Sequence, residues 1–219
     1  MSSADSVALA LSYAYVFAVI ALSELLQRSL HIPVSSTRKF VHIAVGMWAF
    51  GTVLLFQTWY VAVIPPVSFV LINYISYRQD LFKAMESADK RNLGTVYFPI
   101  SFALIIALYW AKPAAIVAGL MTMTWGDALA SLVGRKWGKH RYSLFGYTKS
   151  WEGVASMFAF STLTVLPALA FFGITWPWAL VYALAVSAFA ALVEALSMWG
   201  IDNLTVPLLS TTLLWFLLP

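Results

Sequence analysis

The chain has no cysteine among its 219 residues and little charge of either sign. The missing cysteine excludes disulfides, thiolate metal sites and cysteine nucleophiles. Charged residues make up 10% of the chain and hydrophobic residues 62%, whereas a soluble domain carries roughly 25% charged residues. This composition indicates an integral membrane protein. The net charge of +4 is better explained by loops that face anionic lipid headgroups than by a nucleic-acid partner, and we expect no nucleic acid.

Long apolar runs separated by short polar segments predict the membrane spans. We expect an all-α polytopic bundle of eight transmembrane helices, with seven as the alternative because the last run is short. Pro65 and Pro66 are expected to kink or restart the third span, and Pro33 with residues 35–37 should keep the segment 27–39 free of helix. The whole chain, residues 1–219, is predicted to be a single membrane domain. The predicted spans are residues 7–26, 40–56, 59–77, 93–110, 114–133, 151–172, 178–198 and 204–218.

The lysine and arginine residues fall in alternate loops. The segments 27–39, 78–92 and 134–149 contain 12 of the 13, and Lys112 is the other. Basic loops face the cytoplasm in membrane proteins, so the ends of the spans next to these loops are predicted to be cytoplasmic. We therefore expect the catalytic site at the cytoplasmic face, where the reactive side chains collect. These side chains are Asp127, Glu152, Glu194, Asp202, His42 and Asn203.

Residues 125–153 hold the densest group of acids, bases and glycines in the chain. Charge inside a bilayer is costly and is usually kept for function. Basic side chains beside glycines that let the backbone approach a ligand suit phosphate, and carboxylates suit a hard cation such as Mg²⁺. The stretch therefore predicts a phosphate-handling site at a membrane face, with residues 134–149 forming a loop.

Six short motifs together resemble the family of phytol, farnesol and dolichol kinases, which are membrane proteins. The resemblance implies phosphorylation of the hydroxyl of an isoprenoid alcohol, with CTP as the typical donor. Phytol is the expected acceptor because the chain is short and lacks the extra N-terminal spans typical of dolichol kinases. The motifs are RKFVHI (38–43), LGTVYFP (93–99), GDA (126–128), GRKWG (134–138), KSWEG (149–153) and DNLTVP (202–207).

The charged residues of these motifs define the predicted site. Asp127, Glu152 and Lys149 are the expected catalytic residues, and His42 is a candidate contact for the substrate hydroxyl. Asp127 is a candidate to accept the alcohol proton, but one carboxylate cannot easily bind metal and serve as the only base, so this division of roles stays open. The predicted Mg²⁺ ligands are Asp127, Glu152, Asp202 and Glu194. The predicted nucleotide and phosphate contacts are Arg38, Lys39, Gly134, Arg135, Lys136, Gly138, Lys139, Lys149, Ser150 and Asn203.

Several alternatives remain at this level. Asp127 is also able to pair with a cation on a neighbouring helix, and Glu152 to stabilise a helix start through the helix dipole. Within enzymes, the alternatives are a CTP-dependent diacylglycerol or dolichol kinase and a cytidylyltransferase that forms a CDP-lipid. Outside enzymes, they are a structural membrane subunit and a transporter of a small anion, which would place charges near the bilayer midplane and on both faces. The sequence leaves the oligomeric state and the host membrane open.

Overall fold

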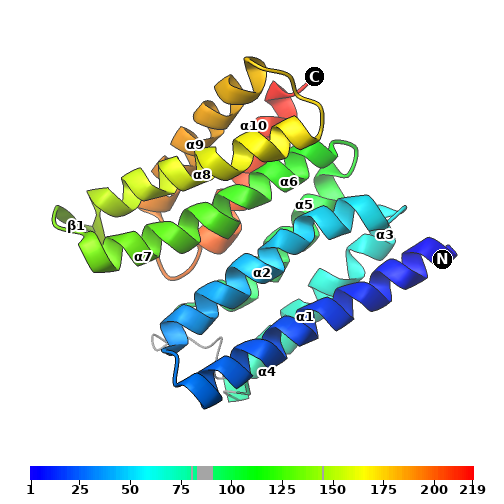
Figure 1. Ribbon diagram of the computed structural model, residues 1–219, viewed down its shortest axis with the longest axis horizontal. Coiled ribbons are helices and arrows are strands. Elements are labelled where there is room, and N and C mark those ends of the chain that lie inside the picture. The colour runs from blue at the N-terminus through cyan, green and yellow to red at the C-terminus, as the bar shows by residue number, and fades with distance from the viewer. Residues whose placement is uncertain (80, 83–90, 145) are drawn as a thin grey trace.

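A computed structural model shows the chain as a bundle of long helices (Figure 1). It describes residues 1–79, 81–82, 91–144 and 146–219. Within these residues the elements are α1 (Ser3–Leu30), α2 (Val34–Leu55), α3 (Trp59–Ala62), α4 (Ile64–Gln79), α5 (Gly94–Tyr109), α6 (Pro113–Met121), η1 (Thr122–Asp127), α7 (Ala128–Trp137), β1 (Arg141–Leu144), β2 (Tyr147–Ser150), α8 (Trp151–Phe171), α9 (Trp178–Leu196) and α10 (Asp202–Leu217).

Six helical rods among the described residues are long and apolar enough to cross a membrane. Two of them are composite, since α3 continues into α4, and α6 continues through η1 into α7. The helices α5 and α10 are shorter, with 16 residues each. The prediction of an all-α polytopic bundle is confirmed, and the protein is a multi-pass membrane protein. The two shorter helices leave the number of complete spans between six and eight.

Prolines mark two helix starts, one as predicted and one not. Pro65 and Pro66 restart the third span, because α3 ends at Ala62 and α4 begins at Ile64. The prediction that residues 27–39 are free of helix is wrong, since α1 extends to Leu30 and α2 already begins at Val34.

The early start of α2 has a local cause. Pro33 is its N-cap residue, and the fixed φ of proline suits the entry to a helix. The hydroxyl of Thr37 donates to the Val34 carbonyl at 3.1 Å, so this polar side chain is satisfied within the helix. As a result Arg38 and Lys39 lie on a helix rather than in a loop.

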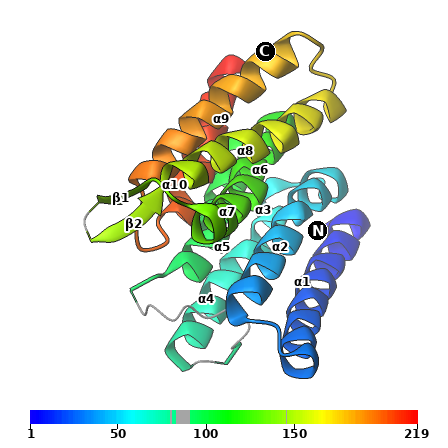
Figure 2. The same cartoon turned by 60° about the vertical axis from the view of Figure 1, so that its left-hand side comes forward.

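The rod formed by α6, η1 and α7 lies in the middle of the bundle. In its most apolar 18-residue stretch, 72% is buried inside the protein, against 22 to 39% in the corresponding stretches of the other five long rods. Figure 2 shows this rod with α8 on one side and α2 on the other. Glycine allows the close packing, since a Cβ atom at Gly119 would lie 2.0 Å from Thr211 Oγ1 of α10.

The central rod widens into one π-helical segment, η1, that ends at Asp127. A π segment displaces main-chain carbonyls from the α-helical pattern and is frequent at functional sites. Here His42 Nε2 of α2 lies 2.9 Å from the Met123 carbonyl oxygen. The segment was not predicted, because nothing in the apolar run around it departs from an ordinary helix.

The prediction of a loop at residues 134–149 is also wrong. The first four residues complete α7, and an antiparallel hairpin of β1 and β2 follows, with Arg141 opposite Ser150 and Leu144 opposite Tyr147. Gly146 adopts a φ of +81° in the turn, a conformation that suits glycine. Each strand has only four residues, which is too short for an alternating pattern to stand out.

The two ends of the bundle differ in chemistry. Figure 1 shows the hairpin at one end and both chain termini at the other. Lys139 follows α7 at the hairpin end, whereas Lys112 Nζ donates to two carbonyl oxygens near the end of α10. The two lysines thus lie at opposite ends of the bundle, as their loops predict. Lys83 and Lys90, from the basic loop 78–92, lie outside the described residues.

Candidate active site

Three carboxylates from distant parts of the chain meet at the hairpin end of the bundle. They are Asp127 at the end of η1, Glu194 in the last turn of α9 and Asp202 in the first turn of α10. One oxygen from each lies within 4.8 Å of the other two. Asp127 and Glu194 are buried, and Asp202 is half-buried. The sequence predicted all three as metal ligands.

The dimensions of this group fit a hard cation. Two oxygens bound to one Mg²⁺ ion are about 3.0 Å apart at neighbouring positions and about 4.2 Å apart at opposite ones, because each Mg–O bond is about 2.1 Å long. The oxygens here are separated by at most 4.8 Å, so each pair has to close by no more than about 2 Å to occupy neighbouring positions on one ion. Carboxylate oxygens are also the ligand type that Mg²⁺ prefers.

Two lysines from different elements are paired with this group. Lys39 Nζ of α2 lies 3.1 Å from Asp127 Oδ2. Lys149 Nζ of β2 lies 2.6 Å from Glu194 Oε1 and also donates to the Glu194 main-chain carbonyl. Three carboxylates and two ammonium groups give a formal charge of −1. A divalent cation would change this charge to +1, which suits the binding of a polyphosphate.

The third carboxylate is held by its own turn. The main-chain N–H and the side-chain amide of Asn203 both donate to Asp202 Oδ1, at 2.9 and 3.0 Å. Gly94 at the start of α5 packs against this turn, since a Cβ atom there would lie 2.8 Å from Asn203 Nδ2. The start of α5 therefore lies directly beside the acidic group.

The hairpin docks on the C-terminal end of α9 through paired residues. Tyr142 of β1 lies opposite Lys149 of β2 in the register. The Tyr142 hydroxyl donates to the Ala195 carbonyl at 3.2 Å. Burial, with a further contribution from the negative charge of Glu194, raises the pKa of Tyr142 to about 12. Strand β2, which carries Lys149, is thus held at the C-terminal end of α9 by its partner strand β1. The helix dipole at that end of α9 also favours a cation.

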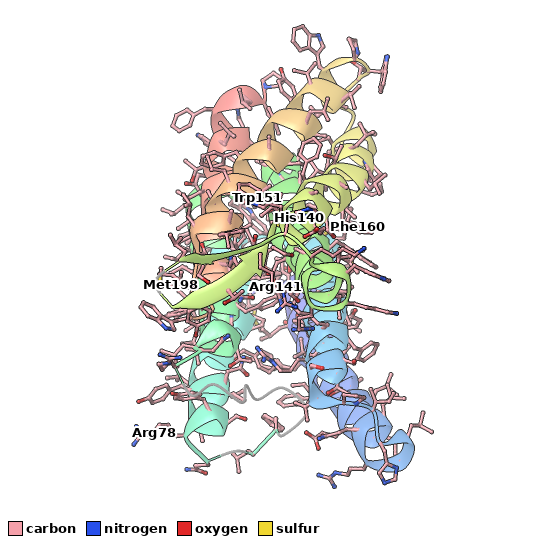
Figure 3. All side chains as sticks on the ribbon, turned by 90° about the vertical axis from the view of Figure 1, so that its left-hand side faces the viewer. Arg78, His140, Arg141, Trp151, Phe160 and Met198 are labelled. Atoms are coloured by element: carbon pink, nitrogen blue, oxygen red, sulfur yellow. The ribbon has the colours of Figure 1, made fainter. Side chains whose placement is uncertain are left out.

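Glu152 lies outside the three-carboxylate group in the described residues. Its Oε1 atom is 2.7 Å from His140 Nδ1 and 3.1 Å from the His140 main-chain nitrogen. Figure 3, which looks at this end of the molecule, shows the hairpin in front with His140, Arg141 and Trp151 near it. Glu152 therefore connects the first turn of α8 to the segment that leads into the hairpin.

Three of the predicted phosphate contacts have packing or capping roles. Ser150 Oγ accepts a hydrogen bond from the Gly153 main-chain N–H and caps α8. Cβ atoms at Gly134 and Gly138 would lie 3.1 and 2.6 Å from Ser150 Oγ, so both glycines allow α7 to approach α8 closely. Gly134 lies within α7 rather than in a loop.

The remaining basic residues of the prediction divide into two groups. Arg38 of α2 lines the cavity described below, beside Lys39. The other three are exposed around the end of α7 and do not reach the acidic group. They are Arg135, Lys136 and Lys139.

An elongated cavity begins at the acidic group and runs between α1, α2, α3, α4 and α5. Its polar end is lined by Lys39, His42, Asp127 and Asn203. The rest of its lining is mainly apolar and includes phenylalanine, proline, valine and isoleucine side chains. His42 packs edge-on against Phe98, with the ring centroids 4.9 Å apart. The arrangement joins a charged site to a chamber of hydrocarbon character, which is the form of a site for an amphipathic ligand.

Asn73 is a residue of the site that the sequence reasoning missed. It lines the cavity, and its Nδ2 atom donates to the Thr95 carbonyl at 2.8 Å. That carbonyl has no N–H four residues ahead, because Pro99 occupies the position, so the amide of Asn73 supplies the missing donor. Its Oδ1 atom is buried without a hydrogen-bond partner in the described residues. A single amide in the apolar run 59–77 is the signal that would have found it.

Comparisons with known proteins agree with the motifs. The chain is 38% identical to a phytol kinase of Synechocystis sp. over 217 residues, which cover 95% of this chain and 91% of that protein. It is 31% identical to a probable chloroplastic phytol kinase of Triticum aestivum, over 94% of this chain and 74% of that protein. No protein-family model matches the chain, and no solved structure does. Because identity at this level extends over most of both chains, the protein belongs to the phytol kinase family.

Proposed function

We propose that the protein transfers the γ-phosphoryl group of CTP to the hydroxyl of an isoprenoid alcohol, with phytol as the leading acceptor and CDP as the second product. One observation carries the proposal: Asp127 belongs to the three-carboxylate group and also lines the apolar cavity. A site suited to a metal and nucleotide therefore meets a site suited to a lipid at one side chain. The relatives' names support phytol, and CTP is the donor implied by the family resemblance.

The cavity suits the acceptor tail. Its walls are apolar along most of their length, so a branched hydrocarbon chain would lose no hydrogen bonds on entering. The hydroxyl would remain at the polar end beside Asp127. There the unpaired Oδ1 atom of Asn73 is available to accept the hydroxyl proton in a hydrogen bond. A neutral acceptor holds the hydroxyl without removing its proton.

The acidic group and its lysines suit the donor. Glu194 and Asp202, with Asp127, would hold Mg²⁺, which when bound supplies positive charge to the phosphate oxygens. Lys39 and Lys149 would turn from their carboxylate partners toward the triphosphate as these carboxylates take up the ion. Phosphoryl transfer depends mostly on positioning the reactants and on stabilising the negative charge of the phosphate oxygens. The three carboxylates with their ion, and the two lysines, would do both.

The proton of the alcohol goes to Asp127 in this proposal. Asp127 is the carboxylate of the three that lines the cavity, so it is the one that a bound hydroxyl meets. The bound hydroxyl first donates to Asn73 Oδ1, and its O–H bond then rotates toward Asp127. As the alcohol oxygen forms its bond to the γ-phosphorus, the proton passes to Asp127, and the bond from that phosphorus to the β-phosphate oxygen breaks to release CDP. Glu194 and Asp202 then carry most of the metal binding.

The other predicted residues receive supporting roles. We assign Arg38, at the cavity, to the phosphate groups, and the exposed basic residues at the end of α7 to first encounter with the nucleotide. Ser150, Gly134 and Gly138 keep α7 and α8 close, so they position the strand that carries Lys149. Glu152 is a positioning residue that holds the segment before the hairpin.

The test uses purified protein in detergent with Mg²⁺ and CTP labelled in either the α or the γ phosphate. Phytol, geranylgeraniol, farnesol, a long polyprenol and diacylglycerol serve as acceptors. We expect γ label, and no α label, in phytyl phosphate. Label from the α phosphate in the lipid would make the protein a cytidylyltransferase, and label in diacylglycerol alone would refute the isoprenoid acceptor. Higher activity with ATP would refute CTP as donor.

A single substitution tests the role of Asp127. Asp127→Asn keeps the size and polarity of the side chain but removes the charge that a hard cation and a proton acceptor require. We expect turnover to be lost while the protein still inserts and keeps its fold. Glu24→Gln is the matched control, because Glu24 is an acid of α1 that pairs with Arg28 away from the acidic group. Near-normal activity of the Asp127 variant would make that residue structural.

We also propose that the site faces the cytoplasm, where CTP is available. The alternation of basic loops supports this orientation. The absence of native cysteine allows single cysteines at positions 139 and 112 to be labelled from each side of sealed vesicles. Position 139 should react from the cytoplasmic side and position 112 from the other. Labelling of both from one side would refute this orientation.

A further inference from the structure

The far end of the apolar cavity is closed by packed side chains. Phe56, Ala62 and Ile106 line it there, with exposed fractions of 6, 1 and 1%. They belong to one buried cluster with Ala8 and Val61. A ligand that enters at the acidic group therefore meets a solid floor, which these three lining residues form.

The floor is held in place by a buried acid. Asp5, in the first turn of α1, is 1% exposed. Its Oδ1 atom accepts a hydrogen bond from the Gln57 main-chain N–H at 2.8 Å, and its Oδ2 atom accepts one from the Thr58 hydroxyl at 3.0 Å. These bonds tie the turn that follows Phe56 to α1. The floor is thus fixed to a helix that also forms a wall of the cavity.

The depth of the cavity follows from the rise of its helices. Between Thr95, which contacts Asn73, and Ile106, α5 rises about 17 Å, and between His42 and its last residue, Leu55, α2 rises about 20 Å, at ~1.5 Å per residue. A hydrocarbon zigzag of ~1.5 Å bonds advances about 5 Å per isoprene unit. The space from the polar end to the floor therefore matches about four isoprene units, which is the length of a C20 alcohol.

We infer that the floor formed by Phe56, Ala62 and Ile106 sets the length of the isoprenoid chain that the protein accepts. The inference rests on the proposed function for the identity of the ligand. A C20 chain would fill the cavity to the floor. A C15 chain would leave the floor uncovered, and a much longer chain would collide with it. Specificity would then lie in side chains far from the reacting hydroxyl.

Substitutions at the floor should move this limit in opposite directions. Ala62→Leu places a larger side chain into the cavity and shortens it by roughly one isoprene unit or less, and Ile106→Phe does so from another helix. Phe56→Ala removes the largest floor side chain and opens the end. Val61→Ala is the matched control, because Val61 belongs to the same buried cluster but does not line the cavity.

The measurement is the ratio of kcat/KM values for farnesol, geranylgeraniol and a long polyprenol. A contact with one methylene in an apolar pocket changes such ratios about 10- to 200-fold. We expect Ala62→Leu and Ile106→Phe to raise the C15 to C20 ratio at least tenfold. Phe56→Ala should raise the ratio of long polyprenol to C20 by a similar factor. Val61→Ala should lower the melting temperature and leave both ratios unchanged.

A second readout separates this inference from the proposed function. The same alcohols are tested for thermal stabilisation of the protein without nucleotide. Length-dependent stabilisation that shifts in the floor variants, with no phosphorylated lipid formed, would retain the length limit and refute the kinase function. Turnover with the wild-type length preference in all folded floor variants would refute the length limit and leave the function intact. No stabilisation and no turnover with any alcohol would refute both.

Discussion

The unpaired oxygen of Asn73 leads to a prediction that the neighbouring proline makes testable. Asn73→Leu removes the proposed hydroxyl acceptor, but it also removes the donor to the Thr95 carbonyl. Pro99→Ala restores an N–H four residues after Thr95, so the helix can satisfy its own carbonyl. The double variant therefore isolates the function of Oδ1, and Pro99→Ala alone is its control.

The expected magnitude is that of one neutral hydrogen bond. Such a bond contributes about 0.5–1.5 kcal/mol, or roughly 2- to 12-fold in affinity. Leaving the Thr95 carbonyl unsatisfied in the single Asn73→Leu variant should cost a further ~1–3 kcal/mol of stability. The single variant should therefore melt at a lower temperature than the double variant.

The assay compares the affinity for phytol with that for its deoxygenated hydrocarbon. The wild type and Pro99→Ala should prefer the alcohol by the factor given above. Asn73→Leu, alone or with Pro99→Ala, should bind the two ligands nearly equally. A double variant that still prefers the alcohol as strongly as the wild type would show that Asn73 does not hold the hydroxyl.

Three further outcomes are expected. Gly119→Ala should destabilise the bundle by about 1–3 kcal/mol because its Cβ atom would collide with the hydroxyl and main chain of Thr211, and an unchanged melting temperature would contradict the close packing of α6 on α10. Lys149→Met should leave the buried Glu194 carboxylate unpaired, lower the melting temperature and raise the KM for nucleotide but not for lipid; a change in the lipid KM alone would assign Lys149 to the acceptor. Chelation should abolish turnover and Mg²⁺ should restore it, and Asp202→Asn should weaken thermal stabilisation by Mg²⁺; turnover that persists in excess chelator would refute the metal role.

The sequence was informative about the fold where its signals were strong. Apolar runs predicted the long helices, and the paired prolines predicted the restart between α3 and α4. The hairpin was missed because its strands are short and polar, and the start of α2 because serine and threonine were read as helix breakers. In a bundle, these side chains satisfy their hydroxyls within the helix.

The candidate site was predictable residue by residue but not as a geometry. Asp127, Glu194 and Asp202 were identified because acids in apolar surroundings are uncommon. The separation of Glu152 from these three acids was not predicted, because the motif 149–153 places Glu152 close to Lys149 in sequence. In the structure, Glu152 lies in the first turn of α8 and contacts His140 instead. The cavity and its floor depend on packing between five helices, which no local pattern encodes.

The central position of the rod formed by α6, η1 and α7 also bears on how the protein is made. Lys39 precedes Asp127 by 88 residues, so during synthesis the cation enters the membrane before the carboxylate that it pairs with. Glu194 and Asp202 follow later, on helices that pack against the helices already inserted. The counter-ion of Asp127, the most buried of the three carboxylates, is thus inserted before Asp127 itself, and the three-carboxylate group is completed only when the last two helices arrive.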